Sequence, residues 1–203
     1  MDTAAAKAAN LRARYARFRK ENPKVRIRDA AVTLGVSEGE LLATGVGDNV
    51  VKLNNDFKEL MRDLHELGRV MALTRNDEIV HERKGVYENA RTEMAHGMAL
   101  FVNPDIDLRI FTNCWHFGFA AEVENPRGTL RSIQIFDQDG SAVHKIYLTD
   151  RSDVDAYDAL VKKFSADDQT RALIVTPKPE KKADRPDDEI DIEGLRKAWE
   201  GMR

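Results

Sequence analysis

The hydrophobic and polar positions of the chain change period near Arg69. Over residues 1–68 apolar side chains recur every three to four residues, which is typical of helices with one buried face. Over residues 69–150 they alternate, which is typical of strands. The runs between these predicted strands are short and leave room for hairpins rather than helical crossovers. We therefore predict an α+β fold, a large antiparallel sheet with N-terminal helices packed on one face.

The helical N-terminal part contains four predicted segments. Their inward apolar positions are Leu11, Tyr15 and Phe18, then Ala30, Ala31 and Leu34, and later Phe57, Leu60, Met61 and Leu64. Their ends are marked by Asn22-Pro23, Gly35 and Gly68. The remaining segment is short, and Ser37 followed by Glu40 is the capping-box pattern that begins a helix.

Eight runs are predicted as strands of the sheet. They are residues 69–75, 78–84, 85–90, 96–102, 106–112, 114–124, 129–137 and 141–149. Residues 151–175 are then expected to form a helix, capped at Ser152 or Asp153, and a closing strand.

The C-terminal part has a different composition. Residues 176–190 hold three of the six prolines and almost no apolar side chain, so we expect a mobile linker. Residues 191–203 resume a helical pattern, with Leu195, Trp199 and Met202 on one stripe. We interpret this pattern as the start of a helix that leads to a second unit.

The composition is that of a globular protein without unusual bias. The chain has 203 residues, 42% hydrophobic and 33% charged, and its net charge of −3 gives no basic field for nucleic acid. The single cysteine, Cys114, excludes an internal disulfide and a thiolate-rich zinc site, which favours a reducing compartment. Because neither a signal peptide nor a membrane-spanning run is found, we expect a cytoplasmic protein without membrane insertion.

Residues 29–42 have the pattern of two helices of a DNA-binding helix-turn-helix. The second helix offers Glu38 and Glu40 where a recognition helix needs Arg, Lys, Asn or Gln. Phosphates would repel these carboxylates. A helix-pair packing unit is therefore favoured, and a DNA-binding regulator is kept as the less favoured alternative.

The five histidines do not form a zinc motif. No HxH, HxxxH or HExxH pattern occurs, and no GxSxG, P-loop or GxGxxG motif is found either. Hydrolase and nucleotide-binding functions therefore find no support in the sequence.

The stretch from Asp105 to Glu124 carries the candidate binding chemistry. Ile106, Leu108 and Ile110 share one face of a strand, which leaves Arg109 on the other. The same alternation predicts one apolar face for the whole sheet, which includes Trp115, Phe117 and Phe119. The second face combines Arg109, Phe111, His116, Gln134 and Phe136. Aromatic rings with a few polar groups suit a large flat or anionic ligand, and the alternative is a face covered by a partner chain or by the tail.

Several stretches resemble the bacterial hemin-degrading and hemin-transport factors. They are "VHERKGVYEN", "NPDIDLRIFTNCWHFGFA", "SIQIFDQDGSAVHKIYLT", "RDAAVTLGVSEGELL" and "LRKAWEGM". The resemblance implies a cytoplasmic protein of iron acquisition that accepts haem after import and stores it, passes it on or opens its ring. It also implies two tandem α+β units, of which this chain matches the first.

The resemblance implies a site around Arg109. The arginine of the "DLR" motif falls on Arg109 and lies on the distal side of the haem, and the histidine of the "VHE" motif makes His81 the candidate iron ligand. Phe111, Trp115 and Phe117 would supply the apolar surroundings, and Gln134 a polar contact. The axial histidine of the family follows the final helix, in the second unit, so haem binding is favoured over ring opening.

The implied partners are haem, a haem importer or haem oxygenase, and a second copy of the chain. A homodimer would replace by symmetry the contact that the second unit makes. A noncatalytic protein-interaction module is the alternative function.

Overall fold

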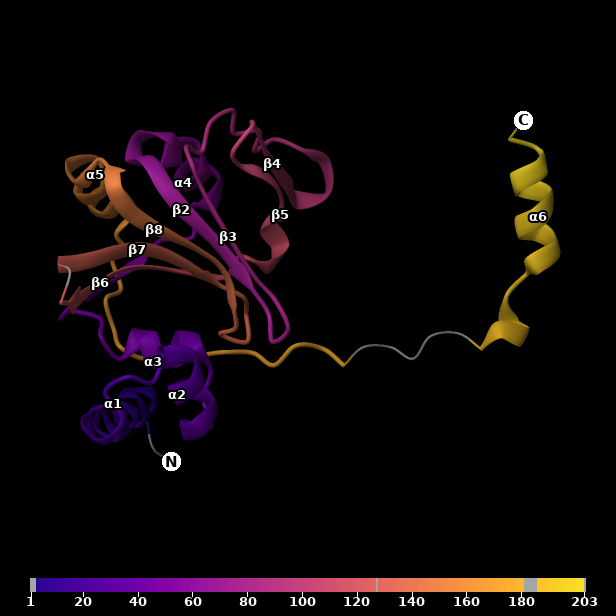
Figure 1. Ribbon diagram of the computed structural model, residues 1–203. Helices are drawn as coiled ribbons and strands as arrows, with labels where there is room; N and C mark the ends of the chain where they lie inside the picture. Colours follow the sequence, from indigo (N-terminus) through magenta and orange to yellow (C-terminus); the bar gives the residue numbers. More distant parts are fainter. Residues whose placement is uncertain (1–2, 127, 181–185, 203) are drawn as a thin grey trace.

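A six-stranded antiparallel sheet forms the centre of the computed structural model, which describes residues 3–126, 128–180 and 186–202. Its strand order is β1-β6-β7-β8-β2-β3, and a separate two-stranded sheet pairs β4 with β5 (Figure 1). The strands are β1 (Val50–Leu53), β2 (Gly68–Arg75), β3 (Val80–Gly85), β4 (Met98–Val102), β5 (Asp107–Phe111), β6 (Phe117–Asn125), β7 (Gly128–Phe136) and β8 (Ala142–Ser152). The predicted fold class is confirmed.

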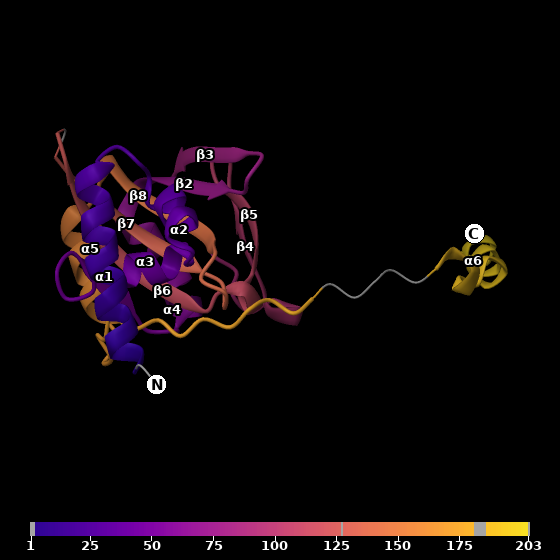
Figure 2. The same ribbon diagram turned by 90° about the horizontal axis from the view of Figure 1, so that it is seen from below.

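Helices cover both faces of the large sheet (Figures 1 and 2). The helices of the described ranges are α1 (Ala4–Glu21), α2 (Ile27–Leu34), α3 (Glu38–Ala43), α4 (Phe57–Asp63), α5 (Val154–Phe164) and α6 (Ile192–Glu200), with short 3-10 turns η1 (Leu64–Leu67), η2 (Ala95–Gly97), η3 (Thr112–Cys114) and η4 (Asp187–Glu189). Helices α2 and α3 pack on one face, whereas α4, η1 and α5 pack on the other. Within the described ranges, no helix is long and apolar enough to cross a lipid bilayer.

The helix ends follow the local signals in the sequence. Helix α1 stops at Asn22, Gly35 closes α2 in the left-handed conformation, and Ser37 and Glu40 form the predicted capping box of α3. Asp153, one of the two predicted caps, accepts the hydrogen bond at the start of α5. Caps depend on a few neighbouring residues, so they can be predicted from the sequence.

Phe117 and Phe119 share one face of β6 as predicted, but Trp115, which precedes the strand, packs in the core on the opposite face. Phe119 and Phe136 pack edge to face under α3, with ring centroids 5.8 Å apart. Gly118 and Ala120 instead face α4, and Phe57 packs so closely that a Cβ on Gly118 would lie 3.0 Å from its ring. Because helices cover both faces of β6, the residues on both of its faces are apolar. The alternation of polar and apolar residues therefore does not identify which face of this strand is buried.

Two strand assignments are also wrong. Strand β1, which lies inside the part predicted as helical, pairs with β6, and its four residues are too short to show a period. The run 85–90 is not a strand, because the chain leaves the sheet after Gly85. A Cβ at this glycine would lie 2.6 Å from the Cβ of Asp105. The segment that leads into β5 therefore packs directly against the end of β3.

The predicted closing strand is also absent from residues 166–180, which the structure describes fully. This segment instead runs past the β7–β8 turn, where the Thr176 amide donates to the Gln138 carbonyl at 2.7 Å. Lys178 forms an ion pair with Asp137 at 3.1 Å. A second backbone bond, from the Ala166 amide to the Lys52 carbonyl at 2.9 Å, and side-chain contacts also hold the segment, and these leave no alternating pattern in the sequence.

The C-terminal helix lies apart from the rest (Figure 1). Helix α6 forms as predicted, and its stripe of Leu195, Trp199 and Met202 is exposed. Part of the predicted linker, residues 181–185, and residue 203 lie outside the described residues.

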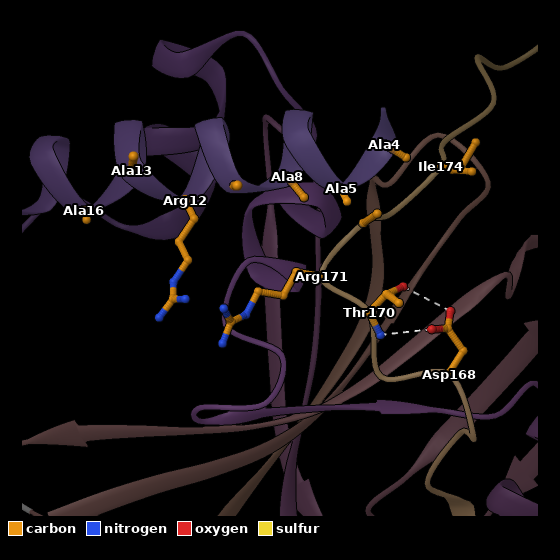
Figure 3. Close-up of a pocket in the computed structure, with 12 residues that line it drawn as sticks. Ala4, Ala5, Ala8, Arg12, Ala13, Ala16, Asp168, Thr170, Arg171 and Ile174 are labelled. Atoms are coloured by element: carbon orange, nitrogen blue, oxygen red, sulfur yellow. Dashed lines mark hydrogen bonds between the residues drawn. The ribbon is translucent and has the colours of Figure 1, made fainter. Parts of the chain in front are cut away.

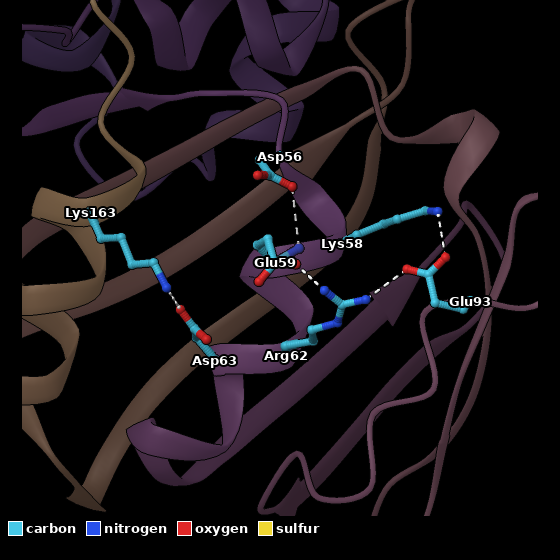
Figure 4. A network of polar contacts seen from close by, with 7 residues as sticks. All are labelled: Asp56, Lys58, Glu59, Arg62, Asp63, Glu93 and Lys163. Carbon is cyan, nitrogen blue, oxygen red and sulfur yellow. Dashed lines mark hydrogen bonds and ion pairs between the residues drawn. The ribbon is translucent and has the colours of Figure 1, made fainter.

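Ion pairs join α4 to its neighbours (Figure 4). Arg62 of α4 contacts Glu93 at 2.7 Å, and Lys58 contacts the same carboxylate at 3.3 Å. On the other side Lys163 of α5 pairs with Asp63. The segment that leads into β4 is therefore held against α4 by the two contacts of Glu93.

A buried ion pair ties α3 to the sheet. The ammonium of Lys145 on β8 donates to the carboxylate of Glu38, and both side chains are buried. The α3 residues Gly39, Leu41 and Leu42 are buried as well. A helix in this position cannot enter a DNA groove, so the helix-turn-helix reading of residues 29–42 is wrong.

Removing one partner of this pair should be costly. Lys145→Met leaves an uncompensated buried carboxylate, and we expect the free energy of unfolding to fall by about 3–5 kcal/mol in urea titrations. The double variant Glu38→Leu with Lys145→Met removes both charges and should recover most of the loss. A double variant as unstable as the sum of the single variants would contradict this account.

A second buried polar group lies on the opposite face of the sheet. Nε2 of His144 is 2.6 Å from the Tyr87 hydroxyl, and Nδ1 is 2.9 Å from the Thr74 hydroxyl. The ring also stacks on Trp115, with centroids 6.5 Å apart. Burial disfavours the imidazolium and lowers the pKa of His144 to about 4.

This histidine should make stability depend on pH. An unfolded histidine has a pKa near 6.5, so between about pH 6.5 and 4 the unfolded state binds more protons than the folded one. The free energy of unfolding should therefore fall by about 3 kcal/mol as pH is lowered through this window. Urea titrations across these pH values should show this loss in the wild type and not in His144→Gln. Parallel profiles for the two proteins would contradict it.

Candidate functional site

The two-stranded sheet forms an arm at the edge of the molecule, defined here as residues 98–111. Its inward side chains, among them Ala99, Phe101 and Ile110, are buried in the main core. The opposite face is formed by Met98, Leu100 and Val102 of β4 and by Asp107, Arg109 and Phe111 of β5. In the register of the hairpin Leu100 lies opposite Arg109, and Met98 lies opposite Phe111. We call this the outer face of the arm.

Arg109 is the cation of the outer face. Its side chain is 70% exposed, and its nearest carboxylate is that of Asp107, 3.9 Å away. An exposed pair at this distance contributes little, and no hydrogen bond joins the guanidinium to another described residue. Its donors are therefore free for a carboxylate or for a ligand on a metal.

Phe111 lies beside Arg109, as the alternation of the strand predicts. Its side chain is 62% exposed, and Val102 at the other end of the hairpin is exposed as well. An exposed aromatic ring between an aliphatic strand and an arginine is a surface for a flat, partly anionic ligand.

His81 lies elsewhere. It is on β3, an edge strand of the large sheet, and pairs with Thr74 of β2. Its side chain is exposed and faces the same side of the sheet as Arg83, two residues on. No described residue forms a hydrogen bond or ion pair with the imidazole, so a ligand could reach it. The structure does not bring it into contact with Arg109.

Three other predicted site residues lie in the core or against it. Trp115 is 6% exposed and packs edge to face on Phe57, with centroids 5.6 Å apart. Phe117 packs against the core under α3. Gln134 is buried on that same face and donates to the Ser132 hydroxyl at 3.0 Å. The prediction placed Gln134 with Arg109 because it assumed one continuous sheet, whereas Trp115 and Phe117 were assigned to the site from the family resemblance. The arm is a separate sheet, so Arg109 and Phe111 lie together without them.

Sequence reasoning missed Met98, Leu100 and Val102. Their alternation with Ala99 and Phe101 was recognised as a strand, but its outward face was not assigned to the site. The signal was the turn at Asn103-Pro104, which joins the two strands as a hairpin and fixes their register.

A large cavity lies on another side of the molecule. It has a volume of about 920 Å³ and is lined by alanines of α1 and by Ile174 and Ala172 of the segment after α5. Figure 3 shows Arg12 and Arg171 at this groove, and both guanidiniums contact Asp48. None of the predicted site residues lines it. In the described part of the chain, no group of three or more His, Cys, Asp or Glu is arranged to hold a metal ion.

The chain matches a family model described as the haemin-degrading HemS.ChuX domain, over residues 35–164. It is 39% identical over 157 residues to the hemin transport protein HmuS of Yersinia pestis, which is 77% of this chain and 45% of the relative. The match therefore spans about half of that protein.

Two solved structures of heme proteins share the fold. The heme-binding protein PhuS of Pseudomonas aeruginosa superposes with a TM-score of 0.87 at 45% identity, over 95% of this chain and 56% of its own. The heme degrading enzyme ChuS of Escherichia coli superposes with a TM-score of 0.76 at 31% identity, over 89% of this chain and 52% of its own. Both relatives are about twice as long as the matched region.

Proposed function

The chain belongs to the family of haemin-degrading HemS.ChuX domains, and we propose that it binds haem for trafficking, storage or degradation in iron acquisition. The observation that carries the proposal is the exposed Arg109 on the outer face of the arm, whose guanidinium has only a weak contact with Asp107 at 3.9 Å. The names of the relatives support the choice of ligand, since PhuS is a heme-binding protein and HmuS a hemin transport protein.

The outer face fits the chemistry of haem. A porphyrin is a flat apolar ring with two carboxylates at one edge, and Leu100, Val102 and Phe111 offer an apolar surface for the ring. The guanidinium of Arg109 keeps its charge at any physiological pH and can donate to a propionate or to a ligand on the iron. Haem would supply the iron and its redox chemistry, and these side chains would hold and orient it.

His81 is the proposed iron ligand within this chain. The observation in its favour is that its imidazole is exposed and unpaired. Against it, its strand belongs to a different sheet from that of Arg109. We therefore give Arg109 the main role in binding and assign to His81 only the ligation of the iron.

A titration with haemin tests the role of Arg109. We expect a sharp Soret band on binding, and an affinity about tenfold lower in Arg109→Ala, because one charge-assisted hydrogen bond is lost. Arg17→Ala is the matched control, since Arg17 is an exposed arginine on α1 far along the chain from the arm. Equal affinities for all three proteins would contradict the proposed site.

The same titration distinguishes the donor role of Arg109 from the iron-ligand role of His81. A Soret band that weakens or shifts in His81→Ala supports iron ligation by this residue, whereas an unchanged band assigns the ligand elsewhere. A broad band that neither substitution affects would mean nonspecific stacking. After binding, a reductant under air tests ring opening: loss of the Soret band indicates degradation, and a stable band indicates a carrier.

The outer face is one wall of a site. It is exposed, so a ligand on it would keep its second face in water unless another surface covers it. The chain spans about half the length of the relatives it matches, and we propose that the opposite wall comes from a second unit or, for this chain alone, from a second copy. Two-fold symmetry would bring two such faces together.

A homodimer is therefore expected in solution. Light scattering at micromolar concentration should give about twice the 23.0 kDa of one chain. The mass should not change in Arg17→Ala, which lies outside the arm. A mass of one chain, with or without haemin, would contradict the dimer.

The proposed setting is the cytoplasm, where Cys114, which is exposed, would stay reduced. A haem importer or a haem oxygenase is the proposed partner for delivery and release. The alternative is a noncatalytic interaction module, which the exposed apolar stripe of α6 favours. Haemin titration distinguishes the two, because a module of that kind needs no haem.

A further inference from the structure

The arm is tied to the large sheet at one carboxylate. Oδ2 of Asp105 accepts a hydrogen bond from Arg69 of β2 at 3.1 Å, and Oδ1 accepts one from Arg83 of β3 at 2.6 Å. Nε of Arg83 also donates to the backbone carbonyl of Asp105 at 3.1 Å. Asp105 lies two residues before β5, so these bonds join the start of that strand to two strands of the other sheet.

The geometry around Asp105 is closely determined. The side chain of Asn103 accepts hydrogen bonds from the amides of Asp105 and Ile106, at 3.0 and 2.8 Å, and so fixes the turn. Gly85 of β3 approaches the same turn so closely that a Cβ there would clash with Asp105. The carboxylate is therefore presented to both guanidiniums by a turn with little freedom.

Few other polar contacts hold this end of the arm. No strand of the arm pairs with a strand of the large sheet in the described ranges. The side-chain amide of Asn103 donates a hydrogen bond to the Val86 carbonyl at 3.2 Å. Apart from this bond, the burial of apolar side chains such as Ile106 attaches this end of the arm. Hydrogen bonds depend on direction as well as distance, so the bonds of Asp105 restrict the orientation of the arm in addition to the apolar packing.

We propose that Asp105 is a positioning residue that holds β5 so that Arg109 is presented on the outer face. This inference rests on the proposed haem site. The direction of Arg109 follows from the orientation of β5, four residues away. The hydrogen bond from Arg69, together with the charge of Arg83, keeps the pKa of Asp105 below its usual range, so the carboxylate is charged at neutral pH.

We call the hydrogen bonds of Asp105 with Arg69 and Arg83 the Asp105 clasp. Hydrogen–deuterium exchange tests its role in the absence of haem. In Asp105→Ala we expect faster amide exchange across residues 98–111, with exchange in β6 and β7 unchanged. Asp48→Ala is the matched control, because the Asp48 carboxylate also accepts hydrogen bonds from two arginines, at 2.7 and 2.9 Å, on another side of the molecule. Unchanged exchange in the arm of Asp105→Ala would overturn the inference. Arg83→Gln serves as the milder variant if Asp105→Ala does not fold, and should give a smaller change in the same peptides.

A double-mutant cycle tests the link to Arg109. If Asp105 acts by positioning Arg109, the roughly tenfold loss of haem affinity in Arg109→Ala should shrink to less than threefold when Asp105 is already alanine. In the Asp48→Ala background the loss should stay tenfold. Additive losses in the Asp105 background would overturn the positioning role, since a purely structural effect leaves the contribution of Arg109 unchanged.

The cycle also separates this inference from the proposed function. If Arg109→Ala has no effect on haemin binding in the wild-type background, the proposed site is wrong. The exchange measurement still decides whether Asp105 fixes the arm.

Discussion

The site depends on the burial of one face of a two-stranded sheet. An isolated hairpin is marginally stable in water, so the arm persists because Phe101 and Ile110 are buried in the main core. Because side chains alternate along a strand, Arg109 and Phe111 must then lie on the opposite, outer face of the arm. The same constraint explains why an arginine stands in a largely apolar strand: the inward positions are fixed by packing, and the outward ones are free for function.

The arm packs against the large sheet through a shared core. The β6 and β7 strands of the large sheet are buried on both faces, under α2 and α3 on one side and under α4 and α5 on the other. This rigid centre holds the two buried polar groups, the Glu38–Lys145 pair and the His144 group, one on each face. The second of these packs Tyr87 between the sheet and the arm, which links the core to the position of β4 and β5.

The elements were more predictable from the sequence than their pairing. Ser37 and Glu40 of the capping box, Gly35 at the end of α2 and Asp153 at the start of α5 act within a few residues, so their pattern is visible in the chain. Which strands share a sheet is decided by contacts between distant residues. For this reason the structure places Trp115, Phe117 and Gln134 in or against the core and not on the outer face with Arg109, and their role in binding stays a prediction. Arg109 and Phe111 were grouped correctly, because both belong to one short strand.

Family membership and geometry support different parts of the account. The relatives support the ligand class that we propose, and the structure shows which side chains lie on the exposed outer face of the arm. The chain spans about half of those relatives, which agrees with an outer face that is open to solvent and forms a single wall. The Asp105 clasp adds a reason why that wall has a defined orientation although its two strands do not join the large sheet.

The most direct test of the central claim is hydrogen–deuterium exchange of the chain with and without one equivalent of haemin. Haem on the outer face should slow amide exchange in residues 98–111 and leave the groove beside α1 unchanged. Slower exchange in residues 4–16 and 168–174, with the arm unaffected, would place the ligand in that groove and contradict the account.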